Sequence, residues 1–80
     1  MTPSIQADRY IDAKGQMCPM PVLMLAKAIR DLQPGQVLAL SATDKGARRD
    51  IPAWAEKTGN KLLDVIEQAD SLTFYIQKAV

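Results

Sequence analysis

The sequence predicts an α+β fold, a βαβαββ two-layer α/β sandwich in which a four-stranded mixed sheet carries two helices on one face. Three observations predict it: helical spacing of apolar residues after Pro19, a continuously apolar run at residues 37–42, and alternating apolar residues near the C-terminus. A strand, a helix and a second strand in succession form a right-handed unit with parallel strands. We expect one domain over residues 1–80, with a loose lead-in at 1–7, because this length supports one modest core.

The first strand is predicted at residues 9–13, where apolar and polar side chains alternate up to Lys14-Gly15. A helix is then predicted to begin at Pro19, because one face collects apolar residues at helical spacing. These residues are Val22, Leu25, Ala26, Ile29 and Leu32. Pro34-Gly35 should end this helix.

The second half of the chain predicts a strand, a helix and two further strands. Residues 37–42 are expected to form an interior strand that is paired on both edges. The second helix should run from Asp50, as N-cap, through Pro52 in its first turn to about Thr58, with Gly59 as its stop. Strands are expected at 61–67 and 72–78, and the buried face of the last one should carry Leu72, Phe74 and Ile76.

Composition excludes several classes of function. The net charge of +1 gives no strong attraction for nucleic acid or membrane, so we expect neither as a direct partner. No apolar run is long enough to span a bilayer, and the N-terminal residues do not resemble a signal peptide. One cysteine and no histidine exclude an internal disulfide, a Cys-His catalytic pair and imidazole metal sites. A cytoplasmic monomer with a free thiol fits best.

The candidate reactive residue is Cys18, which lies in Met17-Cys18-Pro19-Met20-Pro21. Pro19 suits the first position of a helix, which makes Cys18 the predicted N-cap, and Pro21 stiffens the same turn. The sulfur should then face the free amide groups of Met20 and Val22 at the positive end of the helix. We therefore expect the pKa of the Cys18 thiol to lie below its usual value, so that the thiol is partly ionised at neutral pH.

A docking surface around the thiol is predicted from topology. Because helices that follow parallel strands begin at the same end of a sheet, the start of the second helix should lie near Cys18. The candidate docking residues are Met20, Leu23, Met24, Arg30, Lys45, Arg48 and Arg49. The alternative is that the apolar residues only pack at the boundary of the core and the basic residues are solvated surface charges. A nearby arginine would lower the thiol pKa further.

The segment from Asp12 to Pro21, with its CPxP box after a strand and a glycine, resembles the signature of the TusA/SirA-like sulfur-carrier family. Further likeness lies at Gln33-Pro34-Gly35, Asp44, Arg49-Asp50-Ile51-Pro52 and Tyr75-Ile76-Gln77-Lys78. Met20 and Lys45 depart from some members, which have an acidic residue and a proline at these positions. The resemblance implies a two-layer α/β sandwich whose Cys18 carries sulfane sulfur as a persulfide, with Pro19 and Pro21 as its structural brace.

The same resemblance implies a stoichiometric sulfur shuttle, and not an enzyme that turns over independently. It would use no cofactor beyond the persulfide on Cys18. Its donor would be a cysteine desulfurase or a rhodanese-type protein, and a downstream acceptor protein would receive the sulfur for tRNA thiolation, molybdenum-cofactor enzymes or sulfur metabolism.

Two alternatives come from other classes of function. One is a Cu(I)-binding carrier, because Met17, Cys18, Met20 and Met24 supply soft sulfur ligands. The other is a non-catalytic interaction module with an inert cysteine, because a free cysteine is usually a small buried hydrophobe.

Overall fold

A computed structural model describes residues 6–79 and contains every predicted element in the predicted order. The strands are β1 (Arg9–Ala13), β2 (Val37–Ala42), β3 (Lys61–Glu67) and β4 (Leu72–Gln77), and the helices are α1 (Met20–Ile29) and α2 (Ala47–Thr58). Most of the lead-in predicted at residues 1–7 lies outside the described residues. The predicted α+β fold is confirmed.

The four strands form one mixed sheet in the order β1-β2-β4-β3. β1 and β2 are parallel, as their connection through α1 requires, whereas β4 pairs antiparallel with both β2 and β3. β2 is therefore an interior strand, and all six of its residues are buried. The unbroken apolar run at residues 37–42 had predicted this position.

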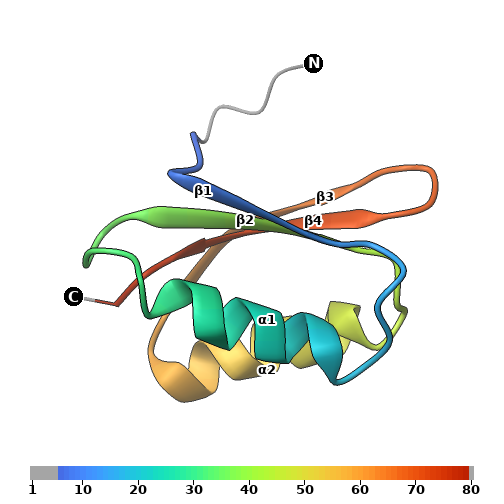
Figure 1. Cartoon of the computed structure of the whole chain (residues 1–80), viewed down its shortest axis with the longest axis horizontal. Helices are drawn as coiled ribbons and strands as arrows, with labels where there is room; N and C mark the ends of the chain where they lie inside the picture. Colours follow the sequence, from blue (N-terminus) through green and yellow to red (C-terminus); the bar gives the residue numbers. More distant parts are fainter. Residues whose placement is uncertain (1–5, 80) are drawn as a thin grey trace.

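Both helices pack against the same face of the sheet, which leaves two layers (Figure 1). Their apolar sides meet the inward side chains of the strands, because each element must bury its apolar face against another. The largest fully buried side chains of this core are Pro21, Leu25, Leu38, Leu40, Ile51, Phe74 and Ile76. The predicted buried face of β4 is confirmed by Leu72, Phe74 and Ile76.

Several predicted boundaries were wrong, and the two helix starts matter for the site. α1 begins at Met20 and ends at Ile29, although Leu32 beyond its end is still buried. α2 begins at Ala47, because the amides of residues 47–50 already bond to the carbonyls of residues 44–46. Pro52 consequently lies inside the helix and not in its first turn. The predicted stop at Gly59 is confirmed by its left-handed conformation, with φ 79°.

Candidate functional site: an exposed thiol between two carboxylates

Cys18 lies in the connection between β1 and α1, and its side chain is exposed. The predicted N-cap was wrong by one residue: Pro19 holds that position, after a cis Cys18-Pro19 peptide bond. The Pro19 carbonyl accepts the first helical bond from the Leu23 amide, whereas the Met20 amide bonds back to Met17 O at 2.8 Å. The Met20 amide is therefore engaged in a turn and is not free to face the sulfur.

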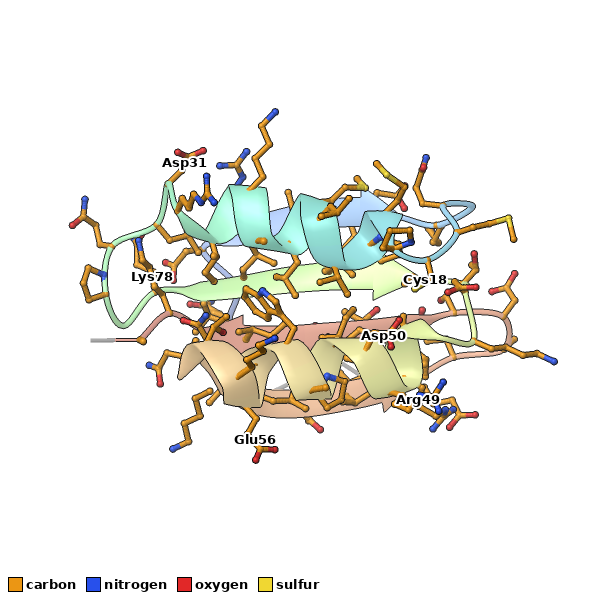
Figure 2. The ribbon with its side chains drawn as sticks, turned by 90° about the horizontal axis from the view of Figure 1, so that it is seen from below. Cys18, Asp31, Arg49, Asp50, Glu56 and Lys78 are labelled. Carbon is orange, nitrogen blue, oxygen red and sulfur yellow. The ribbon has the colours of Figure 1, made fainter. Side chains whose placement is uncertain are left out.

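Two carboxylates surround Cys18 instead. The thiol donates a hydrogen bond to Asp50 Oδ2 at 2.7 Å, and the backbone amide of Cys18 donates to Asp44 Oδ2 at 3.2 Å. Asp44 belongs to the loop after β2, and Asp50 lies in the first turn of α2. Figure 2 shows Cys18 and Asp50 facing each other between the N-terminal ends of the two helices. Asp50 had been predicted to cap its own helix, but no side chain caps α2.

These carboxylates determine the acidity of the thiol. Its hydrogen bond to Asp50 is the largest cause that raises the pKa of Cys18 above its ordinary value, followed by partial desolvation and by the charges of Asp50 and Asp44. The charge of Arg49 acts in the opposite direction, but it is the smallest cause. The predicted lowering of the Cys18 pKa was therefore wrong. At rest the sulfur is held as a thiol, with its proton directed at a carboxylate.

Gly46 allows this close arrangement. A Cβ at this position would lie 3.0 Å from Asp44 Oδ2, and 3.6 Å from both Asp50 Oδ2 and the Cys18 Cβ. The φ of Gly46 is −64°, which any residue adopts, so the constraint is space and not backbone conformation. A Cβ here would press on the Asp44 carboxylate and contact Asp50 and the Cys18 Cβ, so the glycine lets these groups approach one another.

The apolar docking candidates divide by exposure. Met20 and Leu23 are 42% and 54% exposed on α1, close to Cys18 in sequence. Met24 is half-buried and packs against the core, as its boundary-packing alternative predicted. Arg30 is the C-cap of α1, so the helix separates it from the thiol by its full length. Met17, which was considered only as a copper ligand, is 74% exposed next to the thiol.

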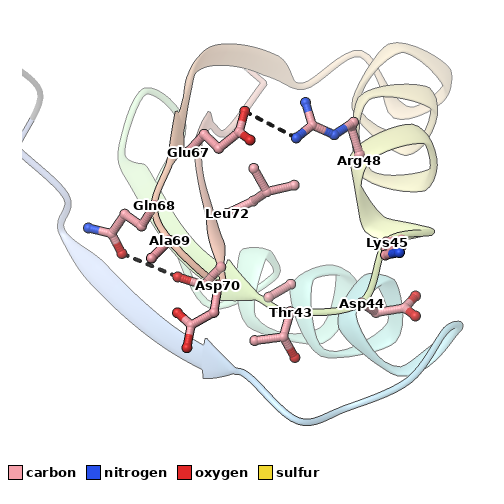
Figure 3. A pocket seen from close by; sticks show the side chains of 11 residues that line it. Thr43, Asp44, Lys45, Arg48, Glu67, Gln68, Ala69, Asp70 and Leu72 are labelled. Atoms are coloured by element: carbon pink, nitrogen blue, oxygen red, sulfur yellow. Dashed lines mark hydrogen bonds and ion pairs between the residues drawn. The ribbon is translucent and has the colours of Figure 1, made fainter.

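The remaining basic candidates lie at the start of α2, on the same rim as Cys18, as the topology predicted. Lys45 and Arg48 line a hollow of about 480 Å³ between the loop after β2 and the turn that joins β3 and β4 (Figure 3). Arg48 pairs there with Glu67 at 3.2 Å, and both side chains remain exposed. Arg49 lies on the side of α2 turned away from Cys18 (Figure 2). Its effect on the sulfur is therefore only long-range.

A second hollow, of about 310 Å³, opens between α1 and α2 beside the thiol. Its lining is mostly apolar and is formed by Pro19, Val22, Asp50, Ala53, Trp54 and Lys57. Asp50 therefore contacts the sulfur on one side and faces an open, largely apolar surface on the other. A molecule in this hollow would contact Asp50, the hydrogen-bond partner of the thiol.

Neither a metal centre nor a membrane span is found in the described part of the chain. Residues 6–79 hold no cluster of three or more acidic, histidine or cysteine side chains placed to bind a metal ion. None of the described helices has the length and apolarity needed to cross a bilayer. The chemistry of the site rests on one sulfur and its two carboxylates.

Fold and site together define a small α+β protein with one accessible thiol on a proline-flanked turn. Comparison with known proteins gives this class a family. Residues 9–78 match the family model described as Sulfurtransferase TusA, so the chain belongs to the TusA family. Membership supports a role as a sulfur carrier.

Individual relatives agree with this assignment. The chain is 45% identical over 74 residues to YrkI of Bacillus subtilis (strain 168), which is provisionally named a sulfur carrier protein; the match covers 92% of this chain and 99% of that protein. It is 42% identical over 78 residues to the sulfur carrier protein TusA of Pseudomonas aeruginosa (strain LESB58), covering 98% and 96%. The crystal structure of a SirA-like protein from Desulfitobacterium hafniense superimposes with a TM-score of 0.79 at 27% identity, covering 90% and 99%.

Sequence reasoning did not place Asp44, Gly46 and Asp50 beside the thiol, although Asp44 and Asp50 lie at positions of family likeness. The signal was available in principle, because the topology that brings Arg48 and Arg49 to the rim of Cys18 also brings the neighbouring aspartates. Asp50 had instead been assigned to a helix cap, the commonest role of an aspartate before a helix.

Proposed function

We propose that this protein carries sulfane sulfur as a persulfide on Cys18. The observation that carries the proposal is the exposure of the lone thiol at the rim of a TusA-family domain. Exposure argues against the inert-cysteine alternative, which requires a buried side chain. An open thiol between two helix ends is accessible to a donor and then to an acceptor.

Each transfer is an exchange at sulfur. The Cys18 sulfur attacks the outer sulfur of a donor persulfide, a new sulfur–sulfur bond forms, and the old bond breaks with its electron pair on the donor sulfur. The donor leaves as a thiol and Cys18 holds the persulfide. An acceptor thiol then attacks that outer sulfur in the same way and regenerates Cys18. The exchange needs no cofactor and no second cysteine on the carrier.

We further propose that the donor is a cysteine desulfurase or a rhodanese-type protein and that the acceptor is another protein of a cytoplasmic sulfur relay. Such a relay serves tRNA thiolation, molybdenum-cofactor enzymes or sulfur metabolism. A carrier of this kind is a monomeric shuttle used once per transfer. Exposed Met17, Met20 and Leu23 beside the thiol supply apolar contact for both partners.

Mass measurement tests the proposal directly. Incubation with a cysteine desulfurase and cysteine should increase the intact mass of the carrier by one sulfur atom, and a reductant should remove it. Cys18→Ser should show no gain, and because Cys18 is exposed this variant should fold normally. Failure of the wild-type protein to gain sulfur from either a desulfurase or a rhodanese-type donor would contradict the proposal.

A further inference from the structure

Among residues 6–79, Asp50 is the side chain that forms a hydrogen bond with the reactive sulfur, and its placement is unusual for a surface aspartate. Its Oδ2 accepts a hydrogen bond from the Cys18 thiol, with sulfur and oxygen 2.7 Å apart. The same residue also lines the hollow between α1 and α2. It forms no ion pair with the residues described, 6–79. A carboxylate has two oxygens, so one can face the thiol while the other faces whatever occupies the hollow.

We propose that Asp50 carries the proton in sulfur transfer at Cys18, an inference that rests on the function proposed above. As the Cys18 sulfur attacks the donor persulfide, the thiol proton passes to the Asp50 carboxylate. The donor sulfur, which leaves with the electron pair of the broken bond, then takes this proton from Asp50. The outer sulfur keeps its own hydrogen throughout. One persulfide and one thiol are consumed and one of each is formed, with no net oxidation.

In the second transfer the direction reverses. The attacking acceptor thiol gives its proton to Asp50, and the departing Cys18 sulfur receives it. The same contact therefore serves loading and unloading, as microscopic reversibility requires of a general acid and base. Protonation of the departing Cys18 sulfur matters in this second step, because a Cys18 thiolate is disfavoured by the nearby charges of Asp44 and Asp50.

The neighbouring charged groups have other placements. Asp44 accepts its hydrogen bond from the backbone amide of Cys18, whereas the thiol donates to Asp50. Arg49 points to the other side of α2, and Lys57 lies further along the same hollow. From α1 and its preceding turn, Pro19 and Val22 line the hollow, and Cys18 is the titratable residue that faces Asp50. Asp50 is thus the group placed to exchange a proton with the sulfur.

The proposal predicts an unusual pH dependence. Attack that starts from the thiol, with an ionised carboxylate as base, has a rate that is nearly independent of pH around neutrality. Attack that needs free thiolate accelerates by about tenfold per pH unit below the thiol pKa. We expect the flat profile for the wild-type protein and the steep one for Asp50→Asn.

The decisive experiment compares two reactions of the same thiol in Asp50→Asn, with Glu56→Gln as the control. Glu56 is an exposed residue of α2 that lies away from Cys18 (Figure 2). The control therefore removes one negative charge from the same helix without changing the contact to the thiol. Alkylation with iodoacetamide releases iodide, which needs no proton, and should be about two- to tenfold faster in Asp50→Asn at neutral pH. Single-turnover sulfur uptake from a persulfidated desulfurase should be about 10- to 100-fold slower.

Opposite shifts in the two reactions would support the proposal, and Glu56→Gln should change neither. If both reactions accelerate, Asp50 acts only through its charge and the proposal is wrong; unchanged uptake with a flat pH profile also overturns it. Asp50→Glu keeps a carboxylate and should recover part of the uptake rate, which separates proton transfer from damage to the fold. Failure of the wild-type protein itself to accept sulfur would instead refute the proposed carrier function.

Discussion

Replacing Lys78 with methionine would test how the end of α1 is held in place. The Lys78 ammonium, which is half-buried, donates hydrogen bonds to the carbonyls of Leu32 and Arg30, the latter at 3.2 Å (Figure 2). Both carbonyls follow the last residue of the helix, where no intrahelical donor is available. Methionine keeps the apolar stem and removes the charged donor, so the two carbonyls lose their partner.

The magnitude follows from the type of bond. One hydrogen bond to a charged group contributes about 1.5 to 3 kcal/mol. Because Lys78 is partly exposed, we expect its two bonds together to contribute an amount in the lower half of that range. We therefore expect Lys78→Met to reduce the free energy of unfolding by about 2 kcal/mol. In a domain of this size, that loss corresponds to a fall in Tm of about 8 to 16 °C.

Equilibrium unfolding in urea measures this change. Lys61→Met is the matched control, because Lys61 is exposed on β3 and its side chain forms no hydrogen bond or ion pair with the residues that the structure describes. The control should stay within about 0.5 kcal/mol of the wild type. A loss below this value in Lys78→Met would show that water replaces the ammonium without cost and would refute the reasoning.

Three further predictions concern the site. Gly46→Ala should change the free energy of unfolding by less than about 1 kcal/mol, because its φ suits alanine, but the new Cβ displaces the Asp44 carboxylate from the Cys18 amide. Sulfur uptake followed by mass should become several-fold slower, and an unchanged rate would show that Asp44 does not orient the thiol. Arg49→Glu should raise the pKa of Cys18 further and slow its alkylation at neutral pH, since Arg49 is the cation that opposes the carboxylates. Reversing Arg48 and Arg49 together should also slow sulfur acceptance and flatten its salt dependence; a rate with unchanged salt dependence would remove both from the docking surface.

Local pattern determined most of the fold. The alternation at residues 9–13, the helical spacing after Pro19 and the apolar run at 37–42 each report one element through the faces that it must bury. The parallel pairing of β1 and β2 then follows from general rules of connection, which is why the common rim of Cys18 and the start of α2 was also predictable. The sequence likewise marks Cys18 as the one candidate thiol, because no other cysteine or histidine exists.

Tertiary structure alone decided the environment of that thiol. Whether a sulfur faces backbone amides or carboxylates depends on where a helix begins, and α2 begins early enough to turn Asp50 toward Cys18 across 32 positions of sequence. Local pattern cannot show this, because an aspartate near the start of a helix can cap that helix or contact a distant residue, and the local sequence is the same in both cases. The pKa of Cys18 follows from that choice: the charges nearest to it come from residues distant in sequence.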